Sequence, residues 1–175
     1  MKTLIVIIAV AVGALLLLAA IVALIGSRLP KEHTASRSIL LHQTPKQVYD
    51  VVRDFSNAPS WRSDLKSIEV QNQSDGKIHF RENSSHGTVN YEVAEDIPER
   101  RLVTRILDTD LGYSGQWTYF FTPENGGTRL QITEDGQVSN VIFRFMSRYV
   151  FGHTATIDGY LTSLAKRFAE DAKPS

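Results

Sequence analysis

Glu134 is the ionisable residue whose place in the sequence points most directly to chemistry inside a fold. It follows Leu130 and Ile132 at alternate positions of a predicted strand, so its carboxylate shares their apolar face. Burial on that face would raise the pKa of the carboxyl group unless a cation such as Arg62 or Arg105 compensates. The alternative interpretation is a carboxylate at a strand end, engaged in a surface salt bridge.

Three further side chains could take part in acid–base or hydrogen-bonding chemistry. His153 lies on the apolar stripe of a predicted helix, where it could transfer a proton, although such a histidine is more often a satisfied core residue. Tyr91 alternates with apolar residues, and Glu82 follows Phe80 in the same manner as Glu134 follows Ile132. No coupled acid–base pair can be identified from the sequence itself.

Trp61 and Arg62 follow the end of a predicted helix. There the guanidinium could bind an anionic head group while the indole covers a ligand. In the alternative interpretation, the tryptophan wedges a short helix onto the sheet and the arginine is solvated.

Several classes of chemistry find no support in the sequence. The chain has no cysteine, which excludes disulfides, thiolate catalysis and cysteine-bound metals. The five histidines are scattered and form no pair at metal-binding spacing, and there is no nucleophile elbow or phosphate-binding glycine loop. Beyond Lys2, 18 basic residues stand against 19 acidic ones, so nothing favours nucleic acid. We expect no metal site and no cofactor.

The element at the start of the chain is an uninterrupted apolar run over residues 4–25. As a helix, its 22 residues would extend about 33 Å, enough to cross a hydrocarbon core of about 30 Å. A cleaved signal peptide is the alternative, but its apolar region is normally shorter, about 7–15 residues, and no good small-x-small site follows. We expect an uncleaved, single-pass anchor that contacts the bilayer through residues 4–25. Basic residues on both sides leave the orientation open.

The remainder predicts one α+β domain. We expect an anchor over residues 1–27, a linker over 28–36, a domain over 37–170 and a tail over 171–175. A strand over 36–42 precedes a helix that Thr44 and Pro45 cap, and Phe55 ends the apolar stripe of that helix. Six strands joined by short turns follow, near residues 65–72, 77–83, 88–97, 101–107, 116–122 and 128–137, which indicates an antiparallel meander. One amphipathic helix over about 141–170 closes the pattern, with Ile142, Met146, Tyr149, Val150, His153, Ile157, Leu161, Leu164 and Phe168 on one stripe.

Three motifs resemble the START-like, polyketide-cyclase (SRPBCC) superfamily. They are Thr44-Pro45-Lys46-Gln47-Val48-Tyr49-Asp50 with Pro59-Ser60-Trp61-Arg62, then Gly115-Gln116-Trp117-Thr118-Tyr119, and finally the segment from Phe143 to Ile157. The resemblance covers about residues 36–168 and implies a helix-grip fold, an antiparallel sheet wrapped around a long C-terminal helix. In such a domain the sheet and helix enclose a cavity.

The alternation of each strand then predicts which side chains face that cavity. The expected ligand-binding residues are aromatic or aliphatic with a few polar groups: Trp61, Arg62, Phe80, Glu82, Tyr91, Arg105, Trp117, Tyr119, Ile132, Glu134, Met146, His153 and Ile157.

The function we expect is a non-catalytic, membrane-tethered protein that binds a hydrophobic small molecule such as a lipid, an isoprenoid quinone or a polyketide-like compound. An alternative is a cyclase or dehydratase with Glu134, His153 or Tyr91 as acid or base. A third is an envelope scaffold whose own side chains fill the cavity. The superfamily includes many activities, so the fold does not choose among them.

Overall fold

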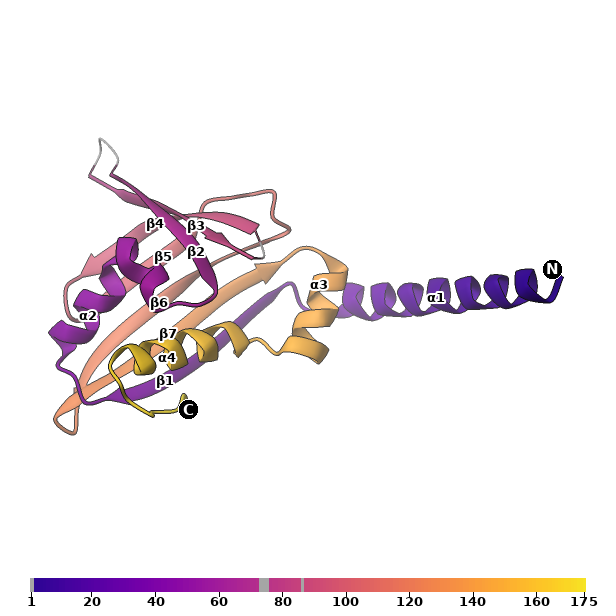
Figure 1. Cartoon of the computed structure of the whole chain (residues 1–175). Coiled ribbons are helices and arrows are strands. Elements are labelled where there is room, and N and C mark those ends of the chain that lie inside the picture. The colour runs from indigo at the N-terminus through magenta and orange to yellow at the C-terminus, as the bar shows by residue number, and fades with distance from the viewer. Residues whose placement is uncertain (1, 73–75, 86) are drawn as a thin grey trace.

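A computed structural model describes residues 2–72, 76–85 and 87–175. A long helix, α1 (Lys2–Arg28), extends away from a domain built on one antiparallel sheet with helices packed on it (Figure 1). This arrangement is the predicted α+β architecture.

Helix α1 is long and apolar enough to cross a membrane, and none of its most apolar window is buried in the domain. Its last turns pack against α3 (Val141–Met146), where Gly26 is buried. A Cβ atom on Gly26 would lie only 2.0 Å from the carbonyl oxygen of Val141, so a larger residue could not be accommodated there. The end of α1 is therefore held against the domain.

The seven strands form one sheet in the order β1-β7-β6-β5-β4-β3-β2, with every neighbouring pair antiparallel. The predicted meander from the second to the seventh strand is confirmed. The first strand crosses to pair with the last one. The strands are β1 (Glu32–Leu41), β2 (Leu65–Asn72), β3 (Ile78–Ser84), β4 (Gly87–Ile97), β5 (Arg101–Ile106), β6 (Tyr113–Glu124) and β7 (Gly127–Val138).

Strand β1 begins four residues before the expected position, at Glu32. Residues 32–36, expected to belong to a linker, pair with β7 from Glu32 opposite Gln137 to Ser36 opposite Thr133. This part of the strand is mostly polar, so it lacks the apolar alternation by which a strand is recognised in a sequence.

Helix α2 (Pro45–Arg53) and the short 3₁₀ helix η1 (Phe55–Ser60) follow β1. Thr44 caps α2 as predicted: its hydroxyl accepts from the Gln47 amide, and the Gln47 side chain accepts from the Thr44 amide. Phe55 belongs to η1 rather than to α2, and its ring is buried.

The single long C-terminal helix was predicted incorrectly. The chain forms α3, then a π-helical turn η2 (Ser147–Phe151), and then a separate helix α4 (Ala155–Arg167). Gly152 separates them with a φ of 76°, a conformation that glycine adopts without steric cost. The expected stripe is divided accordingly: Ile157, Leu161 and Leu164 are fully buried, whereas Ile142, Tyr149 and Val150 are exposed.

The core lies where α2 and α4 pack against the sheet. Its most deeply buried apolar side chains come from β1, α2, β5, β7 and α4, namely Ile39, Leu41, Val48, Leu102, Leu130, Ile132, Ile157, Leu161 and Leu164. The Glu124–Gly127 turn between β6 and β7 lies at the end of the domain that is remote from α1 (Figure 1). We call the half that contains this turn, Leu41, Leu130 and Leu164 the α1-distal half, and the half that contains α3, η2, Tyr113 and Val138 the α1-proximal half.

Candidate ligand-binding cavity

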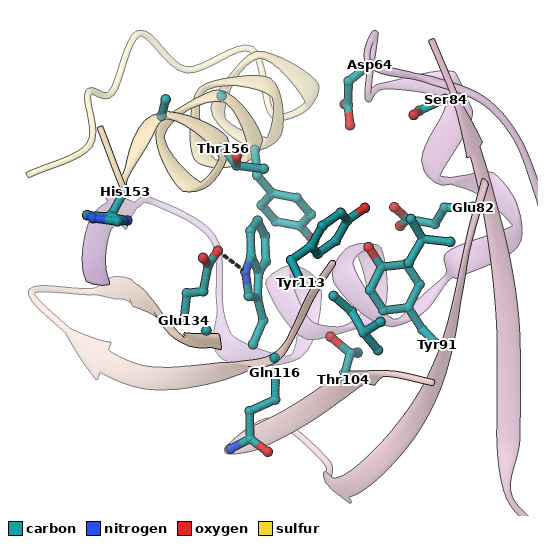
Figure 2. A pocket seen from close by; sticks show the side chains of 18 of the residues that line it. Asp64, Glu82, Ser84, Tyr91, Thr104, Tyr113, Gln116, Glu134, His153 and Thr156 are labelled. Atoms are coloured by element: carbon teal, nitrogen blue, oxygen red, sulfur yellow. Dashed lines mark hydrogen bonds between the residues drawn. The ribbon is translucent and has the colours of Figure 1, made fainter. Parts of the chain in front are cut away.

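A cavity of about 830 Å³ lies between the sheet, α4, η1 and the α3–η2 segment. This volume is within the range of about 300–1,000 Å³ that is usual for small-molecule sites. Aromatic rings line its centre and polar groups gather at two places in its wall (Figure 2).

The aromatic centre of the cavity is built from stacked and edge-packed rings. Phe80 stacks between Phe55 and Tyr91, with ring centroids 4.3 and 5.1 Å apart. Tyr160 of α4 packs against Trp117 at 5.7 Å and against Tyr119 at 5.8 Å. Burial raises the pKa of Tyr91, Tyr119 and Tyr160, so these phenols remain neutral hydrogen-bonding groups.

The first polar cluster surrounds Glu134. One carboxylate oxygen, Oε1, lies 2.9 Å from Nε2 of His33. The other, Oε2, accepts a hydrogen bond of 2.6 Å from the Trp117 indole, the dashed line in Figure 2. The side chains of His33 and Glu134 are only 16% and 22% exposed. Neither Arg62 nor Arg105, the cations expected near Glu134, makes this contact, so the histidine takes that position.

His153 extends this cluster by stacking on His33, with ring centroids 4.3 Å apart. Burial lowers the pKa of His153, and the neighbouring His33 and Arg148 lower it further, while Glu134 opposes them. The imidazole therefore favours its neutral form, in which it can both donate and accept a hydrogen bond.

The second polar cluster lies on the opposite side of the cavity, around Arg62. Its guanidinium is 2.7 Å from both Glu82 and Asp64, and it lies over the Tyr160 ring at 5.2 Å. Burial alone would lower the pKa of Arg62, but Glu82 and Asp64 raise it above its ordinary value. The arginine is thus a permanent charge held by two carboxylates, with both Arg62 and Glu82 largely buried.

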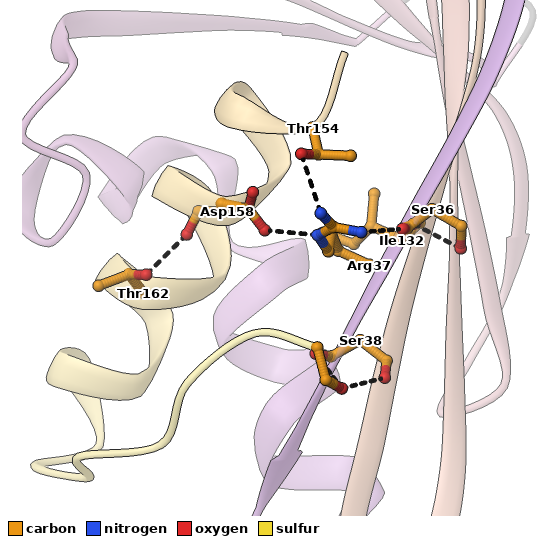
Figure 3. A network of polar contacts seen from close by, with 8 residues as sticks. Ser36, Arg37, Ser38, Ile132, Thr154, Asp158 and Thr162 are labelled. Carbon is orange, nitrogen blue, oxygen red and sulfur yellow. Dashed lines mark hydrogen bonds and ion pairs between the residues drawn. The ribbon is translucent and has the colours of Figure 1, made fainter. Parts of the chain in front are cut away.

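One ion pair and several hydrogen bonds outside the cavity connect α4 and its neighbouring residues to β1 (Figure 3). Arg37 of β1 donates to Asp158 in the first turn of α4 at 3.0 Å and to the Thr154 hydroxyl at 3.2 Å. Ser38 pairs through both backbone groups with Ser175, so the end of the chain also lies along β1. These contacts fix the segment that carries His153.

Nine of the thirteen expected ligand-binding residues line the cavity, and four do not. Ile132 and Ile157 lie in the core, and Trp61 packs edge-on against Tyr160 at 5.3 Å, outside the lining. Arg105 is on the opposite face of the sheet, where it pairs with Glu92. The nine are Arg62, Phe80, Glu82, Tyr91, Trp117, Tyr119, Glu134, Met146 and His153.

Arg105 was assigned to the cavity because each face of β5 carries a buried apolar residue. Leu102 and Val103, one on each face, are both buried, so alternation alone does not identify the cavity side. The structure shows that Thr104 and Ile106 line the cavity and that Arg105 points away from them.

His33 is the most informative residue that sequence reasoning missed. It lies in the polar part of β1 directly opposite Gly136, and a Cβ atom on that glycine would come within 2.4 Å of the imidazole ring. Because residue 136 has no side chain, the imidazole ring can lie over this position and contact Glu134, two residues earlier on β7. A glycine inside a strand is a signal for close approach of this kind, but it does not identify the approaching residue. Other lining residues that we did not expect include Asp64, Tyr113, Phe143 and Tyr160.

The described residues contain no group of three or more histidine, aspartate or glutamate side chains that could hold a metal ion. The arrangement is suited to a different task. It can enclose an apolar body against aromatic rings and offer hydrogen bonds to polar ends of a ligand.

Comparison with known structures identifies the class of fold. A START superfamily protein from Mycobacterium smegmatis superposes with a TM-score of 0.63 at 17% identity, over 77% of this chain and 96% of that one. The di-domain ARO/CYC protein StfQ of the steffimycin biosynthetic pathway matches with a TM-score of 0.62 at 14% identity, over 79% of this chain and 52% of that one. A protein of Thermus thermophilus superposes with a TM-score of 0.61 at 21% identity, over 79% of this chain and 97% of that one. The domain has a START-like, helix-grip fold.

The family follows from the sequence match. Residues 32–169 match the model of the family described as polyketide cyclase/dehydrase and lipid transport, so the chain belongs to this family. A search of curated proteins finds no significant match. The family match begins at the same residue as β1, Glu32.

Proposed function

We propose that this chain is a membrane-tethered protein that binds a hydrophobic small molecule in its cavity without transforming it. The observation that carries this proposal is the cavity of about 830 Å³, whose centre is formed by stacked aromatic rings. Lipids, isoprenoid quinones and polyketide-like compounds combine an apolar body with a few polar atoms, which matches this lining. Membership of a family that includes lipid transport supports the same class of ligand.

Helix α1 supports the membrane part of the proposal. None of its most apolar window is buried by the rest of the described chain, and its length suits a bilayer. A tether of this kind benefits a protein with an apolar ligand, because such a ligand is concentrated in the membrane.

The first test is to identify what the full-length protein holds after extraction in mild detergent. We expect native mass spectrometry to show one apolar species bound in stoichiometric amount, and solvent extraction to release it. Gly159 offers a variant that blocks the cavity: it lines the cavity from α4, and a Cβ atom there would meet no atom within 4 Å. Gly159→Phe should fold and lose the ligand, whereas the matched Gly159→Ala should retain it. Wild-type protein that is folded and empty would favour the scaffold function instead.

An enzyme is the second candidate, and the His33–Glu134 pair is the observation that favours it. A carboxylate that orients a histidine is a common arrangement for general acid–base catalysis. Glu134→Gln separates the two functions, because glutamine retains the shape of glutamate but cannot exchange the proton. For a binding protein we expect affinity for the co-purified molecule to change by less than about tenfold, since one neutral hydrogen bond contributes about 0.5–1.5 kcal/mol.

An enzyme would behave differently in the same comparison. Turnover would fall by about 10²–10⁴ in Glu134→Gln while binding survived. The measurement is ligand affinity together with product analysis for both proteins. Conversion of the ligand by the wild type, lost in the variant, would overturn the non-catalytic proposal.

A further inference from the structure

The segment formed by α3 and η2, residues 141–151, exposes an unusual concentration of apolar side chains. Ile142, Phe143, Tyr149 and Val150 are 51%, 49%, 59% and 56% exposed. In the rest of the described domain, exposed large apolar side chains are scattered, for example Ile97 on β4 and Phe120 on β6. A cluster of this kind indicates a surface that is covered by something in the working protein.

The position of this segment relative to α1 is fixed by specific contacts. The backbone at Val141 packs on Gly26, and the buried side chain of Arg144 donates to the carbonyl of Leu29 at 2.8 Å. The amide of Val138, just before α3, donates to the carbonyl of Lys31 at 2.8 Å. The segment therefore lies directly beside the end of α1, as Figure 1 also shows.

Contact with α1 sets the depth at which the segment would lie in a membrane. The apolar run of α1 ends at Ile25, and its roughly 33 Å length matches a hydrocarbon core of about 30 Å. Gly26, which touches α3, would thus be at the boundary between acyl chains and head groups. Aromatic and basic side chains are favoured at this boundary, and residues 139–152 contain two arginines, four aromatic rings and no acidic residue.

The same segment also forms part of the cavity wall. Phe143, Met146 and Ser147 line the cavity together with Tyr113 and Val138 at the adjoining strand ends. One short stretch of chain therefore connects the end of α1, an exposed apolar surface and the interior of the cavity.

We propose that residues 141–151 lie in the interface of the bilayer that α1 spans, with Ile142, Tyr149 and Val150 among the acyl chains. In this position the segment places the entrance of the cavity at the membrane surface. The ligand then passes between the acyl region and the aromatic centre along Phe143 and Met146 without crossing water. This inference rests on the proposed function in one respect, because it requires α1 to span the bilayer.

The absence of cysteine makes a direct test possible, because single cysteines can be introduced and spin-labelled in the full chain. The protein would be reconstituted in vesicles of phosphatidylcholine and phosphatidylglycerol with labels at Ile142, Tyr149 or Val150. Control labels would be placed at Ile97, an exposed apolar residue far from α1, and at Leu15 in the middle of α1. Collision rates with oxygen, which partitions into lipid, and with a water-soluble nickel chelate are then compared.

We expect the labels at 142, 149 and 150 to collide more often with oxygen than with the nickel chelate, as the label at Leu15 does. The label at 97 should collide more often with the nickel chelate. Nickel access at all three positions equal to that at 97 would overturn the inference. Protection from both reagents would also overturn it, since a protein partner would then cover the segment. The label at Leu15 tests α1 separately: water access there contradicts the proposed membrane anchor itself.

Ligand transfer provides a second measurement. Ile142→Asp combined with Tyr149→Asp should slow uptake of a fluorescent anthroyloxy fatty acid from vesicles by about tenfold or more, because the charged surface no longer enters the interface. Equilibrium binding of the same probe in detergent should be unchanged, and the matched Ile97→Asp should transfer at the wild-type rate. Uptake at the wild-type rate by the double variant would contradict the membrane entrance. If the wild type does not bind this probe, the proposed function fails for fatty acids, and the collision rates still decide the insertion.

Discussion

The two halves of the domain differ in how they use apolar residues. In the α1-distal half, Leu41, Leu130 and Leu164 are completely buried between sheet and helices. In the α1-proximal half, Tyr113 and Phe143 line the cavity, and Ile142 and Tyr149 are exposed. One half thus buries its apolar side chains in a packed core, and the other leaves several of them at a cavity wall or exposed.

The change from one half to the other occurs within single strands. Along β7, Leu130 and Ile132 are fully buried, and two residues later Glu134 enters the polar cluster of the cavity. Because successive residues on one face of a strand are about 7 Å apart, a packed core can change to a cavity within one such step. The consequence is that substitutions in the two halves should affect different properties of the protein.

The largest effect is expected from Leu161→Ala in the α1-distal core. Leu161 is completely buried, so the loss of its side chain should reduce the free energy of unfolding by about 2–5 kcal/mol. Met146→Ala, in the cavity wall, should cost less than about 1.5 kcal/mol because Met146 is only partly buried beside an existing cavity. Denaturant unfolding of the full chain in detergent, followed by tryptophan fluorescence, would measure both. Equal losses in the two variants would show that the cavity wall is as tightly packed as the core.

The features that depend on local signals could be predicted best from the sequence. The capped helix α2 and the antiparallel meander depend on local signals, a capping box and short turns, and both are confirmed. Side-chain alternation placed Phe80, Tyr91, Trp117 and Glu134 on the cavity face, where they lie.

The features that could not be predicted depend on tertiary structure. His33 reaches Glu134 only because β1 pairs with a strand about a hundred residues later in the chain. The period of the C-terminal segment fits one helix throughout, whereas the structure breaks it at Gly152 and packs α3 against α1. The apolar residues that would have formed the first turns of one buried stripe instead face outward.

The same substitution, glycine to alanine, can be made in β7 in each half of the domain, at Gly127 and at Gly136. A Cβ atom on Gly127, in the α1-distal half, would lie 2.0 Å from the carbonyl oxygen of Leu41, and this backbone group cannot move aside. On Gly136, in the α1-proximal half, it would meet side-chain atoms instead of backbone: the His33 imidazole at 2.4 Å and the Glu134 carboxylate at 3.3 Å. We expect Gly127→Ala to destabilise the domain by about 1–3 kcal/mol through overpacking.

Gly136→Ala should change the free energy of unfolding by less than about 1 kcal/mol, because the lost contact to Glu134 is partly offset by the strand preference of alanine over glycine. The displacement of His33 should instead appear in ligand affinity or, for an enzyme, in turnover. Thermal unfolding and ligand binding, measured on both variants, would show whether each substitution affects stability or ligand affinity. A larger loss of stability in Gly136→Ala than in Gly127→Ala would contradict this division.

The smallest effect concerns the pH dependence of stability in the α1-proximal half. The folded protein lowers the pKa of His153 below the value of about 6.5 that an unfolded chain has, through burial, His33 and Arg148. As the pH falls below that value, the unfolded state therefore binds a proton that the folded state resists, so this histidine makes stability decrease with acidification. His153→Gln removes the titrating group. When the pH is lowered from about 7.5 to about 5.5, the melting temperature of this variant should fall by roughly 1–3 °C less than the melting temperature of the wild type. Melting curves of both proteins at these two pH values measure the difference. A wild type that loses less stability on acidification than the variant would show that His153 is stabilised as a cation, and the stacked histidines would then form a charged site rather than a neutral one.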